Sequence, residues 1–169
     1  CYLEPWDCCH FLGEYHPGGY AGDRLRQLMV NFKCRPSTAQ RSPACLRHKR
    51  RAVAAVARAL RTALARSAVE AVTWVPVPPS AAAGEPDYDD RLPQALSAAF
   101  GDYDLDLRLL LRHAVSMAPD HASPVRTNQR SLYERLRVDV ALLQGRPLRT
   151  RIVVFDDLLV TGKHFKCCE

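Results

Sequence analysis

Residues 151–165 read RIVVFDDLLVTGKHF and carry the strongest indication of the fold. Residues 152–155 are four consecutive apolar side chains, which predict a strand buried on both faces, as in a parallel sheet. Asp156 and Asp157 follow directly. Because ligands of open α/β sheets bind beyond the carboxyl ends of the strands, we expect these two carboxylates at a binding site.

A short loop follows the acidic pair and closes on Thr161 and Gly162 before a helix begins at Lys163. Successive backbone N–H groups in such a loop, ending in a helix N-terminus, bind anions. Carboxylates accept hydrogen bonds from sugar hydroxyls. The segment therefore predicts a site for a sugar phosphate. The structural alternative is a buried strand that ends in two solvated aspartates and an ordinary turn at Gly162.

The order of apolar strand, acidic pair and Thr-Gly resembles the phosphoribosyl-pyrophosphate (PRPP) signature of type I phosphoribosyltransferases. Here it reads IVVF-DD-LLV-TG-KH, with Val160 and His164 where threonine or serine is usual. The resemblance implies that Asp156 and Asp157 are the catalytic carboxylates and bind the ribose hydroxyls. It also implies that the loop binds the 5-phosphate through Leu158, Leu159, Val160, Thr161, Gly162 and Lys163.

A second part of the resemblance lies after the apolar segment 71–77, which predicts another strand. Its end, VPVPPS, is similar to the VPVP start of the pyrophosphate loop in ComF-type members, the competence-associated branch of the family. The resemblance assigns the pyrophosphate to Pro79, Ser80 and Ala81. Since proline has no N–H, Ser80 and Ala81 are the better donors. The alternative is a proline-rich turn.

The polar segment 113–128 occupies the position at which the family has a long loop that closes over the reacting centre. The resemblance implies a lid there, with Arg112, Arg126 and Gln129 as its candidate polar residues. The stretch TNQRSLYERL is loosely similar to a Thr-x-x-Gln-x-x-Leu segment of ComF-type proteins.

Arg91 lies at the start of a predicted helix. We expect it either to face the pyrophosphate or to pair with Asp87 or Asp90.

Strands alternate with helices along the chain, which predicts an α/β fold: a mostly parallel sheet flanked by helices, type I phosphoribosyltransferase-like. We expect an N-terminal arm and helices in residues 1–70, where the resemblance places a hood, and the phosphoribosyltransferase-like core in residues 71–169. Family members continue with more helix and further strands, so the resemblance implies a fragment truncated at its C-terminus. Helices are expected at 23–33, 44–67, 91–100 and 131–136, and strands at 11–15, 71–77, 104–111, 137–140 and 152–155, with a loop at 35–43.

Composition places the chain among ordinary globular proteins, with 169 residues and 47% hydrophobic content. No apolar run approaches a membrane span, and no signal-peptide pattern is visible. Seven cysteines, an odd number without a Cys-x-x-Cys pair, favour reduced thiols in a cytoplasmic protein over disulfides or a zinc site. The sequence is compatible with a homodimer.

The net charge is +6, and arginine supplies 20 of the 24 basic residues. This balance suits a polyphosphate substrate or nucleic acid, and equally a solvated arginine-rich surface. Along the helix expected at 44–67, arginines lie mostly opposite the apolar face. A solvated face is favoured over a nucleic-acid helix, because no aromatic or glycine residue accompanies the charges.

The resemblance thus implies a phosphoribosyltransferase of nucleotide metabolism that binds PRPP with Mg²⁺ and transfers the phosphoribosyl group to a nitrogen acceptor. Mg²⁺ is expected to bind through water and PRPP, with no direct protein ligand. The alternative is a non-catalytic PRPP- or nucleotide-binding regulator, or a ComF-like accessory protein of DNA uptake. Val160 and His164, which lack the usual hydroxyl, favour that alternative.

Overall fold

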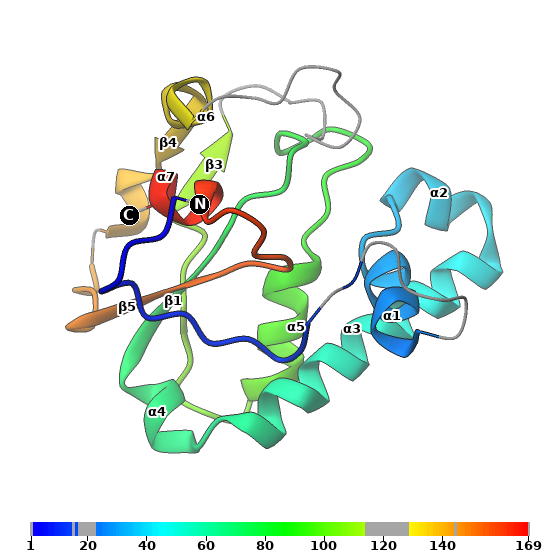
Figure 1. Cartoon of the computed structure of the whole chain (residues 1–169), viewed down its shortest axis with the longest axis horizontal. Coiled ribbons are helices and arrows are strands. Elements are labelled where there is room, and N and C mark those ends of the chain that lie inside the picture. The colour runs from blue at the N-terminus through cyan, green and yellow to red at the C-terminus, as the bar shows by residue number, and fades with distance from the viewer. Residues whose placement is uncertain (1, 15, 17–22, 114–128, 144, 169) are drawn as a thin grey trace.

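The structure, a computed structural model, describes residues 2–14, 16, 23–113, 129–143 and 145–168. A three-stranded parallel sheet lies at its centre, with helices packed around it and a two-stranded ribbon beside it (Figure 1). The helices are α1 (Arg24–Phe32), α2 (Pro36–Arg41), α3 (Pro43–Ala63), α4 (Arg66–Glu70), α5 (Arg91–Phe100), α6 (Gln129–Arg135), the 3₁₀ helix η2 (Val140–Leu143) and α7 (Lys163–Cys168). The strands are β1 (Val72–Pro76), β2 (Asp106–Leu107), β3 (Leu111–His113), β4 (Leu136–Val138) and β5 (Arg151–Phe155).

The sheet has the order β2-β1-β5, and both strand pairs are parallel. Strands β1 and β5 pair over five residues, from Val72 opposite Arg151 to Pro76 opposite Phe155. The α/β prediction is confirmed at this level: a small parallel sheet flanked by helices.

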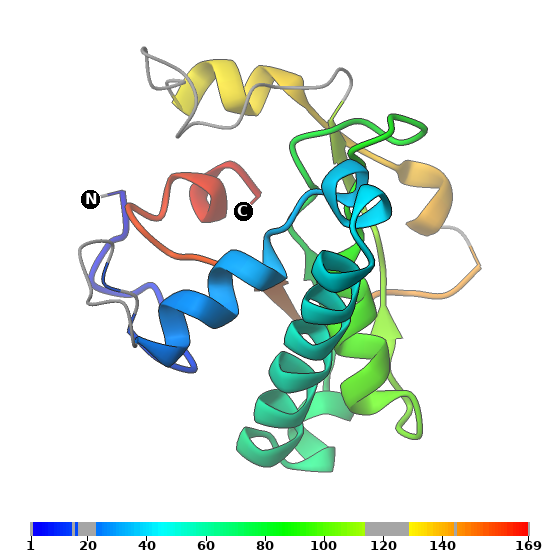
Figure 2. The ribbon, with the colours of Figure 1, turned by 90° about the vertical axis from the view of Figure 1, so that its right-hand side faces the viewer.

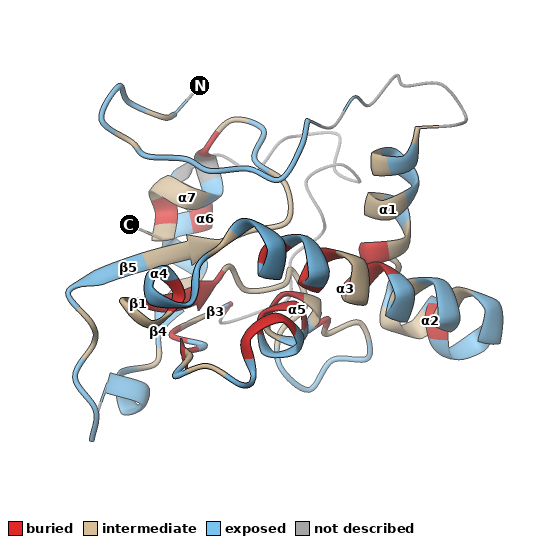
Figure 3. Ribbon diagram, turned by 90° about the horizontal axis from the view of Figure 1, so that it is seen from below, coloured by how far each residue is buried: buried red, intermediate tan, exposed pale blue. Residues whose placement is uncertain are grey.

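Alternate residues of β1 are buried on opposite faces of the sheet. Val72 and Trp74 belong to the main apolar core, to which α3 and α5 contribute side chains such as Val56 and Leu96. Figure 3 shows buried residues concentrated along α5 and the inner side of α3, whereas much of the outer surface of α2 and α3 is exposed. Figure 2, turned by a right angle from Figure 1, shows α3 and α5 side by side on the flank of the sheet. The core therefore fixes one face of β1 against these two helices.

Strand β5 is not buried on both faces, so this prediction was wrong. It is the outer strand of the described sheet, and Ile152 is 51% exposed. Val153 and Phe155 pack partly against the core, on the same side as Trp74. A strand with one neighbour lacks the cover that a central strand has, which is why its apolar run does not imply full burial.

The N-terminal helices follow the prediction with three corrections. Asp23 caps α1, as expected, by accepting hydrogen bonds from the N–H groups of Leu25 and Arg26. The segment expected to be a loop contains α2, which starts with a proline at its first position, where no donor is needed. The long helix ends at Ala63 and is followed by the separate short helix α4. No strand forms in residues 11–14 of the described arm.

The single strand expected at 104–111 is two short strands in different sheets. β2 pairs with β1, whereas β3 pairs antiparallel with β4. Buried Arg108 stands between them and donates to Asp106 and to three backbone carbonyls, those of Leu142, Arg146 and Pro147. This buried guanidinium needs acceptors from the chain beside it, and the strand is interrupted where they are supplied.

Candidate functional site

The loops after β1 and β5 leave the same edge of the sheet. The parallel register puts Pro76 opposite Phe155, and the N–H of Val77 donates to the carbonyl of Phe155 at 2.9 Å. The chain then continues into Pro79, Ser80 and Ala81, all half-buried, on one side and into Asp156 on the other. The two segments assigned to pyrophosphate and to ribose phosphate thus begin beside each other, on strands whose registered pairing fixes their relative position.

Asp157 is buried and fully engaged by two cations. Its side chain is 6% exposed; Lys33 donates to Oδ1 at 3.0 Å, and the Nε of Arg91 donates to Oδ2 at 3.0 Å. A second guanidinium nitrogen of Arg91 also donates to Oδ2. Burial favours the neutral acid and so raises the pKa of Asp157, but Arg91 and Lys33 outweigh burial, and the pKa lies below its usual value. Asp157 is therefore a buried, ionised carboxylate.

The network continues from Arg91 into the N-terminal helices. Arg91 also pairs with Asp89 at 2.8 Å, and Asp89 accepts from Lys49 of α3 at 2.7 Å. Lys49 also donates to the carbonyls of Phe32 and Cys34 at the end of α1. Three cations and two carboxylates thus join α1, α3, the start of α5 and the loop after β5.

The partners expected for Arg91 were wrong. Asp87 accepts instead from the N–H of Ser37, and Asp90 accepts from Gln94. Arg91 reaches Asp157, 66 residues away, and Lys33 reaches it across 124 residues. Lys33, Lys49 and Asp89 were not predicted from the sequence, because no local pattern marks contacts over such separations.

Asp156 differs from its neighbour in exposure and in partners. Its side chain is 25% exposed, Oδ1 accepts from the N–H of Asp157 at 2.7 Å, and Oδ2 lies 3.6 Å from Nδ1 of His164. The acidic pair is therefore divided into one carboxylate held by cations inside the protein and one that is accessible at the sheet edge.

The Thr-Gly loop has the left-handed glycine expected of its sequence. Gly162 has φ +76°, and α7 begins at the next residue. A Cβ at this position would lie 2.5 Å from side-chain atoms of Leu3. Leu159 and Val160 are exposed, the latter by 74%. The backbone of the loop is thus tightly placed at Gly162, while its preceding side chains face outward.

The N-terminal arm lies against this loop, a contact that no sequence pattern predicts. The N–H of Tyr2 donates to the carbonyl of Thr161 at 2.7 Å. Lys166 of α7 pairs with Asp7 at 2.9 Å and with Glu4 at 3.3 Å. Figure 1 shows the start of the chain running beside α7. The arm therefore contacts both the loop and the helix α7 that follows it.

The predicted lid is described only at its ends. Exposed Arg112 lies on β3, and the antiparallel pairing of β3 with β4 brings the flanks of the segment together. His113 is buried, and burial, with smaller effects from His164 and Arg135, lowers its pKa. Arg126 and the side chain of Gln129 lie outside the described residues, as does the side chain of Lys163 in the phosphate loop.

Two surface hollows of the described residues lie away from this edge. One, of about 410 Å³, is lined by residues including Leu107, Arg108 and Leu142. The other, of about 340 Å³, lies between α3 and α5 beside Arg61 and Asp102. Neither hollow is lined by Asp156, Asp157 or the residues of the loop after β1.

The described cysteines are free thiols. Burial, followed by the effects of Asp156 and Cys167, raises the pKa of Cys168 to about 12. Among the residues that the structure describes, no three His, Cys, Asp or Glu side chains gather in a way that could hold a metal ion. Nor is any helix in this part of the chain long and apolar enough to cross a membrane.

Comparison with protein-family models, with curated proteins and with solved structures gave no match. The fold itself places the chain among mixed α/β proteins, with a small parallel sheet, β2-β1-β5, flanked by helices.

Proposed function

We propose that the chain binds PRPP at the carboxyl edge of β1 and β5, where Asp156 and Asp157 accept hydrogen bonds from the ribose hydroxyls. One observation carries the proposal: the parallel pairing of these strands over five residues, which makes the two assigned loops start side by side. Ligands of parallel sheets bind at this edge. The order of strand, acidic pair and Thr-Gly loop supplies the chemistry for a sugar phosphate.

The phosphates would be bound by backbone amides and by the positive charge around Asp157. The 5-phosphate accepts from the amides between Leu158 and Lys163, and the pyrophosphate from those of Ser80 and Ala81. Lys33, Lys49 and Arg91 carry one more charge than the two carboxylates they contact, Asp157 and Asp89. That excess supports a polyanionic ligand.

The reaction proposed is displacement of pyrophosphate from the anomeric carbon of PRPP by a nitrogen nucleophile. A C–N bond forms, the bond from the anomeric carbon to the pyrophosphate oxygen breaks, its electron pair leaves with pyrophosphate, and the nitrogen loses a proton. Positive charge develops on the sugar ring. Asp156 and Asp157 stabilise that charge and hold the ribose in position, which is how such a site accelerates a dissociative step.

Mg²⁺ fits the site only as a water- and phosphate-bound ion. Both oxygens of Asp157 are engaged by cations, which leaves Asp156 as the accessible carboxylate. Mg²⁺ keeps several waters and combines few carboxylates with substrate phosphates. Bound in this way, it would neutralise charge on the pyrophosphate leaving group.

A second candidate, a PRPP- or nucleotide-binding protein without catalysis, is favoured by one observation. Both oxygens of Asp157 are held by Lys33 and Arg91. A ribose that binds Asp157 must share it with those cations. A ligand can therefore bind at this edge while Asp157, held by its cations, does not stabilise the positive charge that develops on the ribose ring during transfer.

The proposal is tested by thermal unfolding with and without Mg²⁺–PRPP. A ligand that binds only the folded state at about 100 times its Kd stabilises by about 2.7 kcal/mol, so the Tm should rise. The rise should be lost in Asp156→Asn and retained in Asp104→Asn, a matched change at an exposed, ion-paired aspartate outside the edge. A wild-type Tm that neither PRPP nor a nucleotide changes would refute the site.

Pyrophosphate release then separates the two candidates. Turnover with a panel of bases and amines that disappears in Asp157→Asn supports the transferase. Tight binding of Mg²⁺–PRPP without turnover supports the non-catalytic protein.

A further inference from the structure

Positive charge is segregated in the N-terminal half of the chain. Residues 24–69 contain 12 of the 24 lysines and arginines and no aspartate or glutamate. All 18 acidic residues lie outside this segment. In the structure the segment forms α1, α2, α3 and most of α4, which run from the right of Figure 1 along its lower side. The net charge of +6 thus understates the charge of this helical unit.

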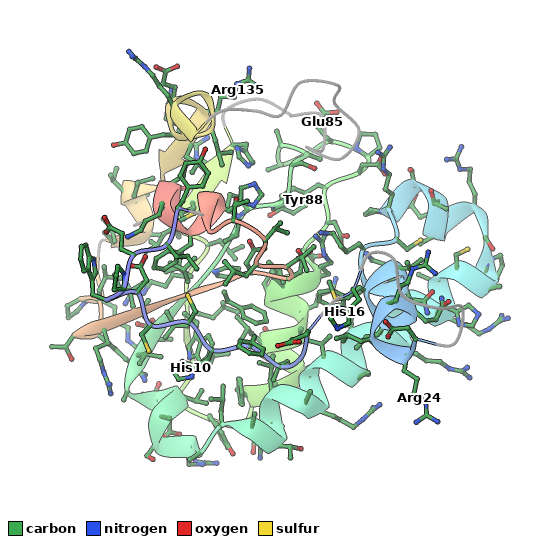
Figure 4. All side chains as sticks on the ribbon, in the orientation of Figure 1. His10, His16, Arg24, Glu85, Tyr88 and Arg135 are labelled. Carbon is green, nitrogen blue, oxygen red and sulfur yellow. The ribbon has the colours of Figure 1, made fainter. Side chains whose placement is uncertain are left out.

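The basic residues of the unit fall into two groups. Four pair with carboxylates from elsewhere in the chain or from the end of α4: Lys33 with Asp157, Lys49 with Asp89, Arg61 with Asp102 and Arg66 with Glu70. The other eight are arginines that form no ion pair with any described residue: Arg24, Arg26, Arg35, Arg41, Arg47, Arg50, Arg51 and Arg58. Seen in Figure 4, Arg24 points away from the body of the protein.

Three of these arginines form a row on α3. Arg47, Arg51 and Arg58 are exposed and lie on the side of the helix opposite the buried Val56 and Leu60. At a rise of about 1.5 Å per residue, their positions are about 6 Å and 10.5 Å apart along the axis. Those spacings are close to two and three times the rise of about 3.4 Å per phosphate of one strand, measured along the axis of a duplex.

The surroundings of the row select the class of polyanion. Residues 33–71 contain no Phe, Tyr or Trp on which unpaired bases could stack. No large hydrophobic side chain of α2 or α3 is exposed, so the row has nothing to insert into a lipid surface. What remains is a rigid set of guanidinium groups, which bind phosphate oxygens in pairs. This chemistry fits a duplex backbone better than a single strand or a membrane.

We propose that Arg47, Arg51 and Arg58 bind the phosphodiester backbone of double-stranded nucleic acid without sequence selectivity. This surface is separate from the edge of β1 and β5, and the inference does not depend on PRPP binding. It revises the interpretation of the arginine face as merely solvated. The reason is the separation of the four cations that pair with carboxylates from the eight exposed arginines that do not, which no sequence pattern contains.

The test measures binding of the whole chain to an arbitrary DNA duplex of about 30 base pairs at several salt concentrations. The triple variant Arg47→Ala, Arg51→Ala, Arg58→Ala removes three contacts and should reduce the slope of log Kobs against log salt by about 2.7. Alanine keeps the helix, and the Tm checks that each variant is folded. The matched control, Arg130→Ala, Arg135→Ala, Arg137→Ala, removes the same charge from exposed positions on α6 and β4.

The proposal predicts that the control binds the duplex nearly as the wild type does and that the triple variant loses affinity for every sequence equally. Equal losses of duplex affinity in the two triple variants would show that only the net charge matters and would overturn the proposal. So would tighter binding to a single strand of the same length. Binding to anionic vesicles without binding to the duplex would identify a membrane surface instead, and wild-type binding that is absent or insensitive to salt would also refute the inference.

Discussion

Asp106 and Asp157 are both buried aspartates paired with arginine, yet their surroundings differ. Asp106 lies within β2 and is bound by Arg108, whose remaining donors are used by backbone carbonyls, and by the hydroxyl of Thr73 at 2.6 Å. Asp157 lies beyond β5, beside the accessible Asp156, and one of its partners, Lys33, has a side chain 36% exposed. A buried charge pair does not by itself mark a site; what distinguishes Asp157 from Asp106 is its position at the edge of the sheet, where we propose that a ligand binds.

Removal of Arg108 should have the largest effect on stability. Arg108→Ala leaves Asp106 without its main cation and three carbonyls without a donor, so we expect a loss of about 3–5 kcal/mol in the free energy of unfolding. Urea unfolding measures it, with Arg146→Ala, a half-exposed neighbour, as the control. A loss below about 1 kcal/mol would mean that this pair is not the rigid cross-link described here.

The next effect separates binding from stability. Asp157→Asn should weaken Mg²⁺–PRPP binding by about ten- to a hundredfold, because a charged hydrogen bond of about 1.5–3 kcal/mol is lost. Asp106→Asn should lower the Tm but preserve the rise that the ligand causes. Calorimetric titration of both variants measures this contrast. Equal ligand responses would remove the functional distinction between the two carboxylates.

Acidification should weaken both pairs. Arg108 and Thr73 lower the pKa of Asp106 against the effect of burial, and Arg91 and Lys33 do the same for Asp157. A carboxylate whose pKa is lowered in the folded state stabilises the protein at pH values above its ordinary pKa of 3.8. This contribution disappears as the pH falls through the folded-state pKa. The free energy of unfolding should therefore fall below about pH 5, less steeply in either Asn variant. A variant with an unchanged acid slope would show that its carboxylate is not held in this way.

Gly162→Ala should have a smaller effect confined to the site. The left-handed φ costs about 1 kcal/mol for alanine, and the new Cβ would press on Leu3. The second substitution Leu3→Ala should relieve the contact but not the backbone strain, so stability should recover in part. Complete recovery would show that the arm, rather than the backbone, requires glycine here.

The exposed pair of Arg130 and Glu134 on α6 should contribute least. Its nitrogen–oxygen distance of 2.9 Å is as short as that between Arg108 and Asp106, but the side chains are 87% and 58% exposed. Water screens such a pair, so Arg130→Ala should change the free energy of unfolding by less than about 0.5 kcal/mol. A cost comparable to that of Arg108→Ala would refute burial as the cause of the difference.

The elements with strong local signals could be predicted from the sequence. The β-branched run 72–76, the periodic apolar residues of α3 and α5, the Asp23 cap and the glycine turn at 162 were predicted because each depends on residues near one another. The parallel pairing of β1 and β5 then places the loops after both strands at one edge, as right-handed crossovers between parallel strands require.

Which charges meet could not be predicted, because it depends on how distant segments pack together. The exposure of β5 depends on having a single neighbouring strand, and the division of 104–111 follows from the acceptors that Arg108 finds across the chain. Asp157 meets Lys33 across 124 residues, while Arg47, Arg51 and Arg58 of α3 form no ion pair with any described residue. Such contacts arise from packing distant segments together, so their energies are absent from any local stretch of sequence.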